Sequence, residues 1–420
     1  MTTKYSVRKQ FHRELTSWSL LAFALAALEG GVAGVLVNHF FSAVVDEFWL
    51  NQAVALVAGA PAIANLSSPF WARMEQGRNK VLMVSVLSIL CSVSILFFVL
   101  SPTGRTGLFL AVLGSLVGRI CWTGVLTVRS TLWRANYPRY IRAKITASLA
   151  LPMSLIMALT GLAIGWISQH SLTGIRWFYL VLSILGISGA FIYRSLQIRG
   201  AENLAHDEIN IKKSEGGFSW HTLITILRKD KAYRGYMRTM FIFGSGNLMF
   251  MAPLILILNH QLLIPQWQQV LITSSVPLAA LPLTIKLWAK SLNKLHIIQY
   301  RAIHSWSFVL AIGIYTLASI LNAPWLLWPA SFTFGTAVAG AVLGWNLGHH
   351  DFTTAERASQ YMAVHVTLTG VRGLIMPIIG VNLYHLLNNI SVDYGRYMLI
   401  LPLLLSFSGA LAFVRMARKN

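Results

Sequence analysis

A charged residue, Arg372, stands in the middle of the hydrophobic stretch 361–386. A charge at the centre of a bilayer costs from about 3 to more than 10 kcal/mol unless it meets a partner or a wet cavity. Tyr361 and His365 lie on the same helical face as Arg372, because residues three and four apart are neighbours on a helix. This polar stripe predicts that the segment lines a cavity at membrane depth.

Glu29 and Arg119 are further candidates for chemistry inside hydrophobic segments. Of the thirteen acidic residues, Glu29 alone falls in the middle of a predicted span, where a carboxyl group can act as a proton carrier. Arg119 shares a helical face with Trp122, a combination that suits a planar anionic or hydroxylated ligand. Gly30 and Gly31 permit close helix packing or local unwinding beside Glu29. The structural alternative is a permanent ion pair that only joins helices.

The charges of these residues do not balance. One glutamate cannot neutralise both Arg119 and Arg372, so the sequence predicts a positively charged cavity that attracts an anion. His365 belongs to a residue type that titrates near neutrality, although a neutral, hydrogen-bonded histidine is the plainer interpretation. We expect Glu29 to couple protons, and the residues expected to bind the solute are Arg119, Arg372, Trp122, Asn247, Tyr361 and His365.

Composition places the chain in the membrane. It has 420 residues, of which 55% are hydrophobic and 11% are charged, whereas soluble globular proteins carry about 25% charged residues. The basic residues behind the net charge of +21 lie mostly in short loops between hydrophobic segments, which indicates topology and argues against nucleic-acid binding. Cys91 and Cys121 lie inside hydrophobic segments and form no metal-binding motif. We expect a polytopic all-α membrane protein without a cofactor or metal.

Hydropathy divides the chain into twelve predicted transmembrane spans. The longest polar interruption separates spans six and seven, which gives a six-helix bundle over 1–195, a linker over 196–233 and a second six-helix bundle over 234–420. The linker is predicted to contain a short amphipathic helix that begins near Ser219. Basic residues gather in both termini and in alternate loops, so we expect both termini in the cytoplasm.

Short matching sequences relate the two halves. Phe70–Arg73 (FWAR) corresponds to Leu287–Lys290 (LWAK) at an offset of 217 residues. A second match, Asn136-Tyr137 against Asp351-Phe352, has an offset of 215 residues. Offsets this similar support a duplicated six-helix unit and therefore two pseudo-symmetric bundles.

Twelve spans, a long central loop and repeated halves resemble the major facilitator superfamily. Members carry a Gly-x-x-x-Asp-Arg-x-Gly-Arg-Arg motif between spans two and three; Gly77-Arg78 matches its end, but the first glycine and the Asp-Arg pair are absent. The resemblance implies a monomer whose spans one, four, seven and ten line a central cavity. It also implies gating near the loops after spans two and eight, where the candidates are Trp71, Arg73, Arg78, Trp288 and Lys290.

These features predict a secondary transporter of the bacterial inner (plasma) membrane. We expect it to move a small organic anion by alternating access, as a proton-coupled symporter, with the solute and the lipid bilayer as its partners. Two alternatives stay open: efflux of lipophilic, drug-like compounds, and a non-transporting receptor or scaffold whose arginines are held in ion pairs. The sequence contains no paired carboxylates, nucleophile elbow or nucleotide-binding motif, which argues against an enzyme and against direct use of ATP.

Overall fold

A computed structural model describes residues 7–75, 77–137, 139–199, 220–353 and 358–419, and these contain helices and loops without a strand. Twelve helical segments in this part of the chain are long and apolar enough to cross a membrane. A helix satisfies its backbone polar groups within its own segment, which is why long apolar runs form helices in a bilayer. The predicted all-α class and the twelve spans are confirmed.

The first six spans form one bundle, in which α1 packs against α8 and α9, and α5 packs against α7 and α9. Spans one, two and three each consist of two consecutive helices, whereas α7, α8 and α9 each form a whole span. The helices are α1 (Val7–Ala27), α2 (Gly30–Phe41), α3 (Glu47–Ile63), α4 (Ser68–Glu75), α5 (Lys80–Ser94), α6 (Leu96–Val99), α7 (Arg105–Asn136), α8 (Arg139–His170) and α9 (Leu172–Arg194).

The last six spans form the second bundle, in which α12 and α16 pack against α19, and α17 packs against α15 and α16. Spans seven and eight contain π-helical turns at Ile257–Gln261 and Leu271–Ser275. The helices are α11 (Trp220–Lys229), α12 (Lys231–Met249), α13 (Met251–Leu256), α14 (Gln266–Val270), α15 (Val276–Leu292), α16 (Ile297–Ile320), α17 (Leu327–Leu347), α18 (Ala358–Ile390) and α19 (Ile400–Ala417).

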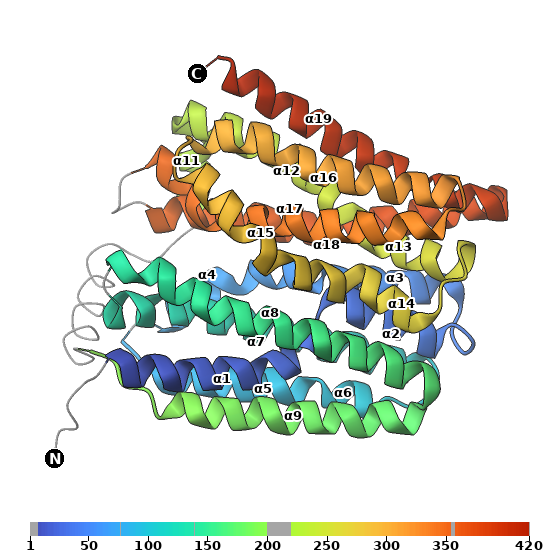
Figure 1. The fold of residues 1–420 in the computed structure, drawn as a ribbon, viewed down its shortest axis with the longest axis horizontal. Helices are drawn as coiled ribbons and strands as arrows, with labels where there is room; N and C mark the ends of the chain where they lie inside the picture. The colour runs from blue at the N-terminus through green and yellow to red at the C-terminus, as the bar shows by residue number, and fades with distance from the viewer. Residues whose placement is uncertain (1–6, 76, 138, 200–219, 354–357, 420) are drawn as a thin grey trace.

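The start of α1 and the end of α19 lie on the same side of the molecule, as an even number of spans requires (Figure 1). We call this side the termini end and the opposite side the distal end. The short helix α11 lies at the termini end and packs on α12 and α18. Its Leu223 is buried and its Ile224 is exposed, so a two-faced helix is present where the sequence predicts one.

Tight contacts join the two bundles toward the distal end, where α3 packs on α18 and α8 packs on α14. Glycine permits this approach at Gly59 of α3, since a Cβ there would lie 2.7 Å from the carbonyl oxygen of Gly373. Four hydrogen bonds between the bundles lie in this distal seam: Gln52–Asn382 (2.6 Å), Glu47–His385 (3.4 Å), Ser168–Gln266 (2.8 Å) and Gln169–Trp267 (3.3 Å).

Two tryptophans show the pseudo-symmetry of the halves directly. The indole of Trp71 donates to the carbonyl oxygen of Ile120 in the fourth span, at 3.1 Å. The indole of Trp288 donates to the carbonyl oxygen of Thr336 in the tenth span, at 2.8 Å. The donors are 217 residues apart and the acceptors 216, so the same hydrogen bond recurs in both halves. The repeat seen in the sequence is therefore a repeat of structure.

Candidate functional site

The first span is interrupted at Leu28 and Glu29. Helix α1 ends at Ala27 and α2 begins at Gly30, while Glu29 has an extended backbone with φ −61° and ψ 131°. Glycine is a poor helix former, and a Cβ at Gly30 would lie 2.6 Å from the carbonyl oxygen of Ala58. Gly30 therefore permits the close packing considered from the sequence, and it begins α2 directly after the interruption. Discontinuous helices of this kind form substrate and ion sites in secondary transporters.

Arg119 of α7 binds this interruption at two points. Its Nε donates to the carbonyl oxygen of Leu28 at 2.7 Å, and its Nη2 donates to Oε2 of Glu29 at 2.8 Å. Arg119 is buried, and the Glu29 side chain keeps 27% of its surface exposed. A single guanidinium thus satisfies a carbonyl freed by the helix break and neutralises the carboxylate beside it. The sequence-predicted residues Glu29 and Arg119 come together as an ion pair.

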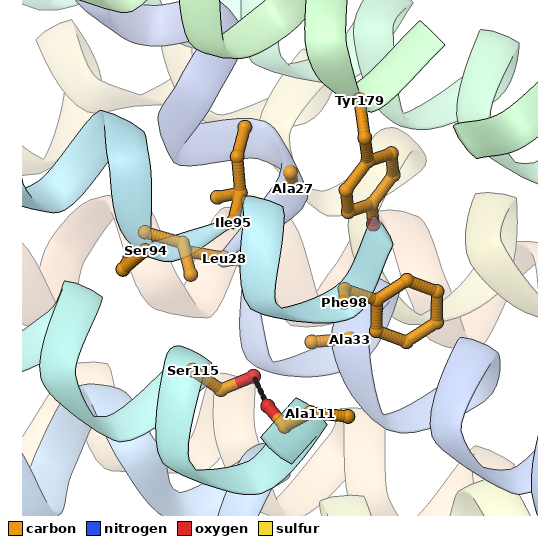
Figure 2. Close-up of a pocket in the computed structure, with 9 residues that line it drawn as sticks. All are labelled: Ala27, Leu28, Ala33, Ser94, Ile95, Phe98, Ala111, Ser115 and Tyr179. Carbon is orange, nitrogen blue, oxygen red and sulfur yellow. Dashed lines mark hydrogen bonds between the residues drawn. The ribbon is translucent and has the colours of Figure 1, made fainter. Parts of the chain in front are cut away.

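A small cavity lies behind this break inside the first bundle. Its volume is about 10 Å³, which is room for about one water molecule and too little for a solute. Figure 2 shows that Ala27, Leu28 and Ala33 of the first span meet Ser115 of α7 there. The predicted ligand residue Trp122 is buried close to the same helices, with its ring 5.0 Å from that of Trp18. Trp122 thus packs against α1.

Arg372 is buried in α18 and is held by oxygen atoms that carry no charge. Its Nη1 donates to the carbonyl oxygen of Met240, its Nη2 donates to Oγ1 of Thr369 at 2.9 Å, and its Nε donates to the carbonyl oxygen of Leu368 at 3.2 Å. Gly244 of α12 makes room for the guanidinium, because a Cβ there would lie 1.8 Å from Nη1. The charge is therefore hydrogen-bonded, and none of the hydrogen-bond acceptors found among the described residues neutralises it.

Asn247, Tyr361 and His365 lie at three separate places. Asn247 accepts a hydrogen bond from Ser406 of α19 at 3.0 Å. The hydroxyl of Tyr361 donates to Asp230 at 2.8 Å, which ties α18 to the start of α12. His365 is buried with its ring 5.9 Å from that of Trp345, in edge-to-face contact. None of the three hydrogen-bonds to Arg119 or Arg372 in the described residues.

The predicted gating residues divide into two groups. Trp71 and Trp288 hold neighbouring helices within their own halves through the hydrogen bonds given above. The three basic candidates, Arg73, Arg78 and Lys290, are exposed.

Glu14 and Arg301 are buried charged residues that the sequence reasoning did not single out, as are Glu75 and Lys80. Glu14, before the predicted start of span one, is buried in α1 and accepts hydrogen bonds from Tyr137 at 2.6 Å and Trp18 at 3.2 Å. Arg301 is buried in α16, where its Nη1 lies 3.4 Å from Nδ1 of His304. Both are near predicted span edges, where charges usually face water. Aromatic residues spaced around Glu14 were the available signal for the first; Arg301 had none.

The two halves therefore differ in buried charge. In the first half, Glu29 neutralises Arg119. In the second half, Arg301 and Arg372 are buried, whereas the described acidic residues lie at helix ends. Asp230 accepts from the backbone N–H of Tyr233, Asp351 accepts from that of Ile297, and Asp393 pairs with Arg396. An excess of positive charge in a low-dielectric interior favours the binding of an anion.

The repeated six-helix halves, the interrupted first span and the buried charges define a polytopic membrane transporter. A profile of the Major Facilitator Superfamily matches residues 15–377, and the chain belongs to this superfamily. Among curated proteins, none matches the sequence significantly.

Solved structures share the fold at low sequence identity. The D-xylose-proton symporter gives a TM-score of 0.73 at 13% identity, with 97% of each chain covered. The nucleoside transporter NupG gives 0.67 at 15% identity, over 96% of this chain and 98% of that chain. The xylose transporter XylE from E. coli, in a partially occluded inward-open conformation, gives 0.66 at 13% identity, over 96% of both chains. These likenesses establish the fold alone.

Proposed function

We propose that this protein is a secondary active transporter that moves a small organic anion by alternating access and couples it to protons. In this proposal it resides in a bacterial inner membrane with the termini end in the cytoplasm. The observation that supports an anionic solute is the burial of Arg372, because the hydrogen-bond acceptors of its guanidinium are all uncharged.

The donors that remain on Arg372 fit a carboxylate or phosphate. A guanidinium has five N–H groups, and three of them are used by Leu368, Met240 and Thr369. One N–H is left on each terminal nitrogen. Two donors on one planar group can hold both oxygens of an anion, an arrangement about twice as strong as a neutral hydrogen bond. Burial strengthens the attraction further, because the local dielectric constant is low.

Glu29 and Arg119 supply a means of coupling solute transport to protons. Protonation of Glu29 removes the negative charge from the pair and leaves the guanidinium of Arg119 free to bind an anion. The carboxyl group sits at the helix interruption, so the same step can change how α1 and α2 join. A proton and an anion would then bind together, which is the thermodynamic requirement for symport.

The scaffold alternative, in which the arginines are held in ion pairs, would be favoured by a closed group of Glu29, Arg119 and Arg372. Instead, Glu29 pairs with Arg119, and Arg372 bonds to the backbone of α12 and to its own helix. An unneutralised arginine is a costly way to join helices, because a buried charge without a counter-charge is destabilising. This arrangement favours a solute-binding role over a purely structural one.

Uptake into proteoliposomes tests the proposal. A panel of radiolabelled mono- and dicarboxylates, phosphorylated sugars, neutral sugars and nucleosides is offered with an inward proton gradient. We expect saturable uptake of an anion and a loss of at least about tenfold in Arg372→Gln, which corresponds to about 1.4 kcal/mol. Arg105→Gln, which removes an exposed arginine, is the matched control and should keep full activity. Unchanged anion uptake in Arg372→Gln, or saturable uptake of neutral solutes alone, contradicts the anion model.

A further inference from the structure

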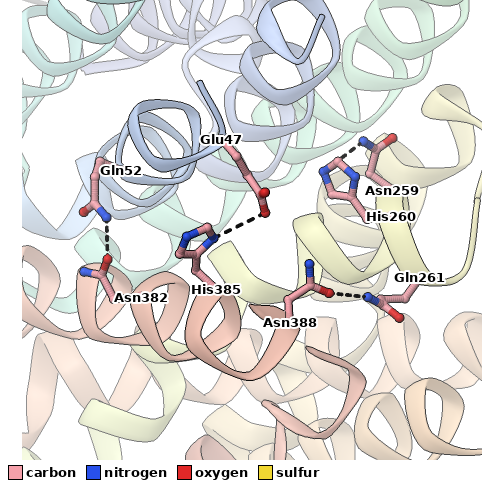
Figure 3. Close-up of polar contacts among 8 residues, drawn as sticks. All are labelled: Glu47, Gln52, Asn259, His260, Gln261, Asn382, His385 and Asn388. Carbon is pink, nitrogen blue, oxygen red and sulfur yellow. Dashed lines mark hydrogen bonds and ion pairs between the residues drawn. The ribbon is translucent and has the colours of Figure 1, made fainter. Parts of the chain in front are cut away.

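The distal seam contains a titratable contact between the halves that the transport site does not use. His385 of α18 lies with its Nδ1 3.4 Å from Oε1 of Glu47 on α3 (Figure 3). One turn earlier on α18, Asn382 accepts a hydrogen bond from Gln52 of α3 at 2.6 Å. The two helices are therefore joined across the bundle interface by one amide pair and one pair that can be charged.

Solvent reaches this contact from the distal surface. A cavity of about 330 Å³ adjoins it, and both halves supply its walls: Ser42, Glu47 and Leu50 from the first, His260, Gln261 and Asn388 from the second. The side chain of Glu47 is 49% exposed and that of His385 is 25% exposed. Protons from the distal compartment can thus reach the pair without passing through the transport site.

The groups around Glu47 and His385 are mostly uncharged or already paired, so the charge at this contact depends mainly on the pair itself. Gln261 and Asn388, beside it in Figure 3, are bonded to each other at 3.0 Å and carry no charge. Other titratable or charged groups on the surrounding elements are Asp46 with Arg105, Asp393 with Arg396, His39 of α2, whose carbonyl accepts from Ser42, and His260 and Tyr384, which both interact with Glu47. The first two sets are neutral ion pairs, so the competing histidines among these described groups are His39 and His260.

We propose that Glu47 and His385 form a pH-operated latch that holds the distal seam closed while His385 is protonated. An imidazolium attracts the carboxylate across the seam, whereas a neutral imidazole keeps only a long hydrogen bond. Acid in the distal compartment therefore favours the distal-closed conformation, and alkali releases it. Because Glu47 is half exposed, the pair changes the ratio of open to closed molecules by only about two- to fivefold.

The test measures opening of the distal end without any solute. Spin labels are placed at Trp49→Cys on α3 and Leu386→Cys on α18, two exposed positions, in a Cys91→Ser/Cys121→Ser background in lipid nanodiscs. Pulsed electron spin resonance gives the distance distribution at pH 5.5 and pH 8.5. We expect the population with the longer distance to rise about two- to fivefold at the higher pH.

Variants assign the response to the pair. His385→Gln and Glu47→Gln should abolish the pH dependence, and the exchange Glu47→His/His385→Glu should restore it. Gln52→Ala removes the neighbouring uncharged contact and should open the seam slightly while it keeps the pH dependence. A response that survives in His385→Gln, one that disappears in His260→Gln or His39→Gln, or its absence in the parent protein would overturn the latch. Failure of anion uptake leaves this result unaffected, because the readout needs no solute.

Discussion

Arg119 and Glu29 meet where the first span leaves its helical path, and the same guanidinium also binds the carbonyl oxygen of Leu28. The ion pair is thus part of the backbone geometry of the break. A change in the charge of Glu29 alters both the electrostatics of the site and the support of the interrupted helix. Because the ion pair also supports the helix break, substitution of either Glu29 or Arg119 should affect transport.

Glu29→Gln should uncouple transport from protons. The amide keeps the size of the carboxyl group and can still accept a hydrogen bond from Arg119, but it cannot bind and release a proton. We expect uptake driven by a proton gradient to disappear while exchange of labelled for unlabelled solute continues. Counterflow in proteoliposomes with and without the gradient separates the two activities. Gradient-driven accumulation in Glu29→Gln would show that protons use another residue.

Arg119→Lys should fail although it retains the charge. A lysine ammonium is a compact point charge and lacks the rigid fork that spans two acceptors, here the carbonyl of Leu28 and the carboxylate of Glu29. We expect transport to fall about tenfold or more, and the free energy of unfolding to fall by about 1 to 3 kcal/mol because one acceptor is left unpaired. Uptake and thermal melting measure these effects. Arg176→Lys, at a partly buried arginine with one backbone contact, is the control that should change neither strongly.

The depth of the buried charges could be predicted from the sequence, but their partners could not. Hydropathy alone places Glu29 and Arg372 inside spans, because apolar residues surround them. Partners depend on how each helix is rotated and where it bends. Asn247 faces Ser406, and Arg372 reaches the backbone of Met240, and neither contact leaves a periodic signal in the sequence. The helix interruption at Glu29 could be predicted from the sequence, since two consecutive glycines follow it.

Gly244→Ala should disrupt the site of Arg372 without changing the arginine itself. The added methyl group would overlap Nη1, so the guanidinium must leave its acceptor on Met240 or the helices must separate. We expect a loss of about 1 to 3 kcal/mol in the free energy of unfolding, as for other overpacked interiors, and anion uptake reduced about tenfold. Gly235→Ala on the same helix is the matched control, because its Cβ would lie 3.7 Å from the nearest atom, in Met416. Equal effects of the two substitutions would remove the special role given to the Arg372 pocket.

Gly59→Ala should shift the protein toward the distal-open conformation. A methyl group at Gly59 would lie 2.7 Å from the carbonyl oxygen of Gly373 and 3.0 Å from the ring of Pro377, both on α18 in the other half. Backbone atoms cannot move aside as a flexible side chain does, so α3 and α18 must part.

We expect the distance between spin labels on α3 and α18 at the distal end to lengthen at every pH. Gly313→Ala controls for the substitution itself, since its Cβ would lie 3.8 Å from Leu403 within the second half and would leave the seam intact. The effect of charge on the seam should be independent of the effect of packing. Glu47→Gln should remove the pH dependence of opening, whereas Gly59→Ala should raise the open population and keep the pH dependence. The reason is that packing and charge act on different contacts of the same pair of helices. A distance distribution in Gly59→Ala that matches the parent protein would mean that the seam does not close by this glycine contact.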